Sequence, residues 1–180
     1  MRAAAPALAA ALALSACAAG LTVVQPVEIV GPYISTEPRA IVPAMPLEVR
    51  GTPPDDSPPE AVAAAMRVPI SQGGRPMELL PPGDPGPGPR VVVVFRGGVS
   101  GNPCLPGPAP PRPAAEDPGP LTAALAFCRG DRILTRTTMR SGATRGPSDA
   151  EFGRAMDIAL RELLTTRPWP PPPPLLFADD

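Results

Sequence analysis

The stretch RVVVVF at residues 90–95 is a continuous run of apolar, mostly β-branched residues behind one arginine. Residues of this kind favour strands, and the lack of polar alternation predicts a strand that is buried on both faces. Gly97 and Gly98 follow the run and are expected to end the strand. We therefore expect a fold organised on a sheet that contains residues 91–94.

The sequence LTAALAFCRGDRILTRTT at residues 121–138 predicts a β-hairpin. Its turn is expected near residues 129–131, because glycine and aspartate favour tight turns. Nearer the N-terminus, residues 17–40 contain apolar residues that are interrupted by Pro26 and Pro32. Since proline is excluded from central strands, this segment is expected to be a tether or an edge strand.

The strongest helix prediction covers residues 149–164. Ser148 and Glu151 have the spacing of a capping box, in which the two side chains accept hydrogen bonds from backbone N–H groups of the first turn. Asp157 and Arg161 form an i,i+4 pair on the outer side. The apolar stripe that we expect to pack on the sheet consists of Phe152, Ala155, Met156, Ala159, Leu160 and Leu163.

A second, shorter helix is predicted from Ser57 to about Met66. Ser57 is expected to cap it, Pro58 suits the first helical position and Glu60 completes another capping box. Together these elements predict an α+β fold. It would have a small antiparallel sheet, one packed C-terminal helix, long proline-rich loops and disordered termini.

Proline and glycine limit how much of the chain can form a core. The 180 residues include 32 prolines and 17 glycines, a share typical of low-complexity segments. Leu, Ile, Val and Phe account for 39 residues, so only a small core is expected. Proline-rich loops are predicted at residues 81–89 and 103–120. A proline-rich tail at residues 167–180 would present Trp169 to a partner, lie across the domain or stay disordered.

The residue types argue against catalysis. The chain has no histidine, which removes the commonest general base and the most frequent transition-metal ligand. The sequence GGVSG at residues 97–101 lacks the glycine two positions after the serine that a nucleophile elbow requires. The neighbouring acids at residues 55–56 and 116–117 lie in proline-rich loops, where solvated carboxylates are ordinary. We therefore expect no enzyme, no catalytic residues, no cofactor and no metal site.

The net charge of −1 gives no basic face for nucleic acid, so no nucleic-acid partner is expected.

The first 16 residues, MRAAAPALAAALALSA, have one arginine, Arg2, beside the N-terminus and continue as an uncharged run. This run is too short to span a bilayer, which takes about 20 residues. It ends in the sequence Leu14-Ser15-Ala16-Cys17, which resembles the lipobox of bacterial lipoproteins. The alternative is an ordinary secretory signal that is followed by a chance cysteine.

The resemblance implies that a signal peptide at residues 1–16 is cleaved before Cys17, and that the Cys17 sulfur receives a diacylglyceryl group. Two acyl chains anchor a protein stably, whereas one binds a membrane only marginally. Ala18 follows the cysteine in place of aspartate, which by the sorting rule of enteric lipoproteins implies the outer membrane, facing the periplasm. No later segment approaches 18 apolar residues, so the lipid is the expected membrane attachment.

The other two cysteines, Cys104 and Cys128, are expected to form a disulfide. The three cysteines of the chain divide into one lipid site and one pair, and an exported domain meets an oxidising compartment. Two thiols, free or buried, or an intermolecular bridge are the alternatives.

The predicted organisation is a signal peptide at 1–16, a tether or edge segment at 17–40, a small α+β domain at 41–166 and a tail at 167–180. We expect a lipid-anchored protein of the bacterial cell envelope with a structural or protein-interaction role and an envelope protein as partner. The alternative is a small-ligand-binding or enzymatic accessory lipoprotein. A concave apolar pocket with convergent polar groups would favour the alternative, and an exposed apolar edge would favour protein partners.

Overall fold

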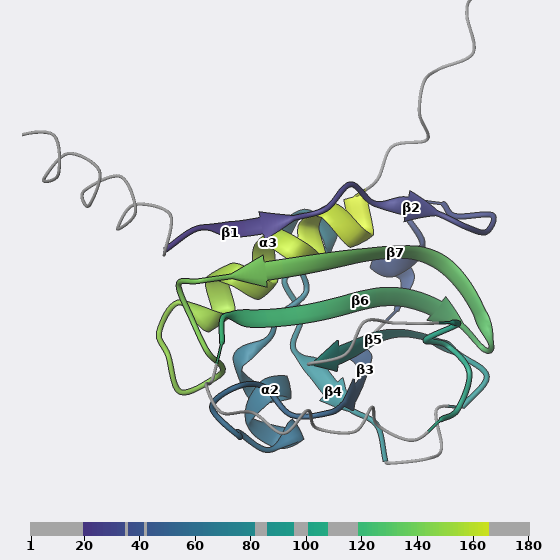
Figure 1. The fold of residues 1–180 in the computed structure, drawn as a ribbon. Coiled ribbons are helices and arrows are strands. Elements are labelled where there is room, and N and C mark those ends of the chain that lie inside the picture. The colour runs from purple at the N-terminus through teal and green to yellow at the C-terminus, as the bar shows by residue number, and fades with distance from the viewer. Residues whose placement is uncertain are drawn as a thin grey trace, which may run out of the picture.

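The computed structural model describes residues 20–34, 36–41, 43–81, 86–95, 101–107 and 119–165. These residues form an open, seven-stranded sheet with the helices packed against it (Figure 1). The signal segment with Cys17, the glycines at 97–98, the acids at 116–117 and the tail at 167–180 lie outside the described residues.

The predicted α+β class with a C-terminal helix is confirmed. The strands are β1 (Thr22–Val24), β2 (Glu28–Ile29), β3 (Met45–Arg50), β4 (Met77–Leu79), β5 (Pro89–Phe95), β6 (Leu121–Arg129) and β7 (Arg132–Ser141). The helices are α2 (Pro59–Ala65) and α3 (Phe152–Thr165), with 3-10 helices η1 (Glu37–Ala40) and η2 (Ile70–Gln72). The sheet order is β1-β7-β6-β5-β3-β4, and β2 also pairs with β7.

The sheet is mixed, so the predicted antiparallel arrangement holds for only part of it. β5, β6 and β7 are antiparallel as predicted, and β1 and β2 pair antiparallel with β7. β3, however, runs parallel to both β4 and β5. For β3 and β4 the reason is α2, which lies between them in the chain. A helical crossover returns the chain to the same end of the sheet, so the strands that it joins run parallel.

Strand β5 is buried on both faces, as its sequence predicts. Because side chains alternate along a strand, Val91, Val93 and Phe95 face the core beneath the helices. Val92 and Val94 point to the opposite face, where they pack in a second apolar cluster. The strand ends at Phe95, and its first residue is Pro89, a position where proline costs no hydrogen bond in the middle of the ladder.

The predicted hairpin is confirmed and extends to Ser141. Arg129 and Arg132 are the last paired residues, so Gly130 and Asp131 make a two-residue turn. Gly130 has a φ of +54°, in the left-handed region that favours glycine. The Arg-Gly-Asp sequence therefore serves as a turn.

Helix α3 buries the predicted stripe, together with Leu164, against β6, β7 and β1. Arg161 Nη2 lies 2.6 Å from Asp157 Oδ2, which confirms the predicted pair. Both predicted capping boxes are wrong. The hydroxyls of Ser57 and Ser148 donate to Asp55 instead, and α2 starts behind Pro58 with no side-chain cap.

The described part of residues 17–40 packs on the domain as an edge. β1 and β2 lie one after the other along β7 (Figure 1). The Tyr33 hydroxyl donates to the Leu164 carbonyl, and its ring meets the Phe127 ring edge-on, with centroids 5.9 Å apart. Burial, and secondarily the charge of Glu37, raise the pKa of Tyr33. The edge-strand alternative therefore holds for this segment.

No helix within the described parts of the chain has the length and apolar character needed to cross a bilayer.

Candidate functional site

We call the face of the sheet opposite α3 the outer face. The predicted disulfide fixes a loop against this face. Cys104 lies in the loop at residues 101–107 and Cys128 lies near the end of β6. Their Sγ atoms are 1.98 Å apart and their Cα atoms 5.7 Å apart. The bond holds the loop over Val92, Val94 and Ala126, which form an apolar cluster with the two cysteines.

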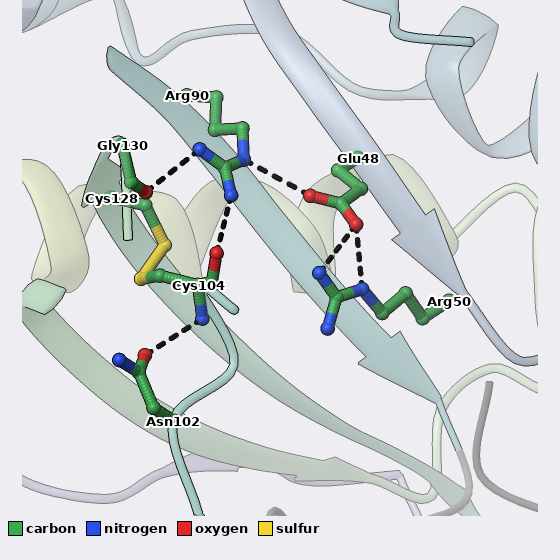
Figure 2. Close-up of polar contacts among 7 residues, drawn as sticks. All are labelled: Glu48, Arg50, Arg90, Asn102, Cys104, Cys128 and Gly130. Carbon is green, nitrogen blue, oxygen red and sulfur yellow. Dashed lines mark hydrogen bonds and ion pairs between the residues drawn. A yellow bond between two sulfur atoms is a disulfide. The ribbon is translucent and has the colours of Figure 1, made fainter. Parts of the chain in front are cut away.

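Next to the disulfide, Arg90 is buried with 1% of its surface exposed. Its guanidinium donates three hydrogen bonds in three directions (Figure 2). Nε donates to Glu48 Oε2 at 3.0 Å, Nη1 to the Gly130 carbonyl at 2.9 Å and Nη2 to the Cys104 carbonyl at 2.6 Å. One side chain thus joins strand β3, the hairpin turn and the disulfide loop. The fork of an arginine suits this arrangement, because its donors lie in fixed directions.

Glu48 is the shared acceptor of two arginines. Its Oε1 accepts from Arg50 Nε at 2.6 Å, while its Oε2 accepts from Arg90. The side chains of Glu48 and Arg50 are 14% and 11% exposed, so most of this network is shielded from water. The carboxylate of Glu48 thus bridges two guanidinium groups, and removing either arginine would leave a buried charge short of a partner.

Asn102, a residue of the same loop, makes two further hydrogen bonds that fix the loop. Its Oδ1 accepts from the Cys104 backbone N–H at 2.9 Å, and its Nδ2 donates to the Asp131 carbonyl at 2.7 Å. The loop and the hairpin turn are therefore joined by the disulfide, by Arg90 and by Asn102.

Reduction of the disulfide is expected to destabilise the domain by about 3.5 kcal/mol, which is the loop-entropy figure for a closure of this length. Chemical denaturation with and without reductant measures the effect. The double variant Cys104→Ser, Cys128→Ser is the control, and its unfolding midpoint should not respond to reductant. A wild-type midpoint that stays in place although both thiols are free would contradict the prediction.

A pocket of about 570 Å³ opens at the hairpin tip. We call it the hairpin-tip pocket. Its walls come from the edge segment, the disulfide loop and the hairpin: Val30, Gly31, Pro32, Gly101, Asn102, Arg129, Asp131, Arg132, Ile133, Leu134 and Arg136. Arg129 is paired with Glu37 and Arg136 with Glu28, whereas Arg132 is exposed. The volume suits a small ligand, and the lining combines apolar residues with three arginines and one aspartate.

Asp55 is a structural carboxylate, and the expectation of a solvated loop acid is wrong for it. It accepts hydrogen bonds from the backbone N–H and the hydroxyl of Ser57, and from the same two groups of Ser148. Gly146 leaves the space for it, since a Cβ there would lie 2.0 Å from Asp55 Oδ1. Asp55 therefore fastens the segment before α2 to the segment before α3. Partial burial acts to raise its pKa, but the bonds from Ser148 and Ser57 outweigh this and lower it.

Asp55 makes the free energy of unfolding depend on pH. Its pKa is lowered on folding, so its contribution is present above the ordinary value of 3.8 and is lost as the pH falls below it. Asp55→Asn should cost about 1 kcal/mol at pH 7, and the difference from wild type should shrink below about pH 4. Unfolding midpoints at pH 7, 5 and 3 measure it. A difference that stays constant across this range would refute the role.

Of the predicted site residues, the structure brings Cys104 and Cys128 together and leaves Cys17 outside the described residues. The described parts of the chain contain no group of three or more His, Cys, Asp or Glu side chains that could hold a metal ion. Sequence reasoning missed the network of Arg90, Glu48 and Asn102. The one available signal was an arginine at the head of a strand that is buried on both faces, because a buried arginine requires partners.

Comparisons of this chain with protein-family models, with curated proteins and with solved structures found no match.

Proposed function

We propose that this chain is a lipid-anchored protein of the bacterial cell envelope, held by acyl chains on Cys17 in the outer membrane and facing the periplasm. The observation that carries the proposal is the sequence Leu14-Ser15-Ala16-Cys17 at the end of a short uncharged run. The disulfide between Cys104 and Cys128 supports it, because such bonds persist in oxidising compartments.

Within the envelope, the domain has a structural or protein-interaction role. Two features support this over catalysis. The buried charged side chains of the outer face bond to one another and to backbone carbonyls. The Asp55 carboxylate accepts hydrogen bonds from Ser57 and Ser148. Five of the eight large apolar side chains that are exposed among the described residues lie between residues 21 and 34, a concentration typical of a contact surface.

Cys17→Ser is expected to move most of the protein from the membrane pellet to the soluble fraction, because the lipid provides the attachment. Fractionation followed by intact-mass analysis measures both the location and the lipid. Ala18→Ser is the matched control, since it keeps the cysteine and should stay in the pellet. An unmodified Cys17, or cleavage elsewhere with unchanged fractionation, would contradict the proposal.

The interaction role is tested by affinity capture from crosslinked envelopes. One envelope protein should be retained in stoichiometric amount by the wild type and lost with Cys17→Ser. The alternative, a small-ligand-binding lipoprotein, is favoured by the hairpin-tip pocket. Native mass spectrometry of protein purified from envelopes would then show a bound small molecule that Arg132→Glu removes.

A further inference from the structure

The exposed apolar side chains of this domain are concentrated in one short segment. Eight large apolar side chains are exposed among the described residues, and five of them lie between residues 21 and 34: Leu21 (60%), Val23 (58%), Ile29 (40%), Val30 (50%) and Ile34 (67%). This segment contains β1 and β2, which form the edge of the sheet next to β7 (Figure 1). We call it the apolar edge. Exposed apolar side chains that are concentrated in this way are typical of a contact surface. Val23 is paired with the exposed Arg140 and shares its face of the sheet, whereas Ile29 is paired with Thr135 on the face that carries α3.

The chain between the proposed lipid and the apolar edge is short. Five residue steps separate Cys17 from Thr22, the first residue of β1. A fully extended chain covers at most about 3.6 Å per residue, so these steps span about 18 Å at most. That length is less than the width of the sheet, which is about 24 Å for five spacings between strands. A lipid on Cys17 therefore keeps the start of the apolar edge close to the bilayer.

The charges beside the apolar edge suit a lipid surface. The single carboxylate of the segment, Glu28, is neutralised by Arg136, and Glu37, which follows the segment, is neutralised by Arg129. Arg140 lies opposite Val23 in the β1–β7 register, and its side chain is exposed. Within the described residues no carboxylate pairs with Arg140. The flank of the edge thus carries an unbalanced positive charge, which anionic headgroups attract.

We propose that the apolar edge lies against the lipid headgroups of the membrane that holds the lipid anchor. Leu21 and Val23 enter the interface and Arg140 meets anionic headgroups. This inference rests on the proposed lipidation of Cys17. It also assigns an orientation, because the opposite edge of the sheet, formed by β4 and covered by α2, then faces away from the bilayer. A protein partner would reach the domain from that side.

Fluorescence in vesicles tests the orientation with the full-length lipidated protein. The background is Trp169→Phe, which removes the single native tryptophan. Val23→Trp places an indole on the apolar edge, and Ala64→Trp places one at an exposed position of α2, at the opposite edge. Both proteins are reconstituted in vesicles of phosphatidylethanolamine and phosphatidylglycerol that contain brominated lipid. We expect a blue-shifted emission at position 23 and at least twofold stronger quenching there than at position 64.

Intact-mass analysis of the same samples separates the two levels of the proposal. If Cys17 carries lipid and the two indoles are quenched equally, the orientation is overturned and the lipid anchor stands. If Cys17 carries no lipid, both fail. If the indole at position 23 is shielded from brominated lipid and from acrylamide alike, a second copy of the chain covers the edge and the lipid contact is overturned. Leu21→Trp replaces Val23→Trp if that variant does not fold.

Discussion

Phe152→Ala is expected to lower the free energy of unfolding by about 3–5 kcal/mol, because the ring is fully buried and its removal leaves a cavity. Phe152 is the first residue of α3 and belongs to the core that α2 and α3 share with the sheet. A domain of this size has about 5–15 kcal/mol in total, so the loss is a large fraction of it. Urea denaturation followed by circular dichroism measures the change.

Ile158→Ala is the matched control for this prediction. Ile158 lies on the same helix but its side chain is 39% exposed, so its truncation should cost about 1 kcal/mol. If Phe152→Ala shifts the midpoint no more than Ile158→Ala does, then α3 does not pack as described.

Arg90→Met is expected to destabilise the domain by about 3–5 kcal/mol, as loss of one partner from a buried ion pair does. Methionine fills much of the space, but it leaves Glu48 with Arg50 alone and removes the donors to the carbonyls of Gly130 and Cys104. Buried acceptors without donors are costly. Arg90→Lys should also destabilise strongly, because a single ammonium group cannot reproduce the three directions of the guanidinium. Denaturation midpoints measure both variants.

Arg161→Met serves as the control for charge removal. Arg161 is 60% exposed and pairs within one helix, so its loss should cost about 0.5 kcal/mol or less. A double-mutant cycle of Arg90→Met with Glu48→Leu should show that the double variant costs less than the two singles added together, since the stranded carboxylate is then removed. Additive costs would mean that the two side chains do not interact.

The elements that sequence reasoning located correctly are those whose burial pattern is visible within one segment. The run at residues 91–95 lacks alternation because both of its faces are covered, and the stripe from Phe152 to Leu163 repeats with the helical period. The hairpin was found because Gly130 and Asp131 interrupt two long strand-like runs. Strand β3 was missed because its sequence, MPLEVR, contains a proline and charged residues.

The outer-face site was less predictable than the fold. The pairing of Cys104 with Cys128 followed from the small number of cysteines, which left one pair once Cys17 was assigned to lipid. The roles of Ser57 and Ser148 were assigned wrongly because a capping box is a local pattern. Asp55, which is 93 residues from Ser148 in the chain, binds both hydroxyls. A local pattern cannot register a competing acceptor that is distant in sequence.

The sequence by itself determined the α+β class, the strand at 90–95, the hairpin, the helix that closes the core and the cysteine pair. Each of these depends on residue type and spacing along a single stretch or on a count. Only the tertiary structure decided that β3 runs parallel to its neighbours, that Arg90 bonds to Glu48 and two carbonyls, and that the apolar edge is exposed. These features depend on which segments meet across the sheet. Contacts between distant segments are determined by burial and hydrogen bonding in the whole domain. They produce no periodic pattern within the sequence of any one segment.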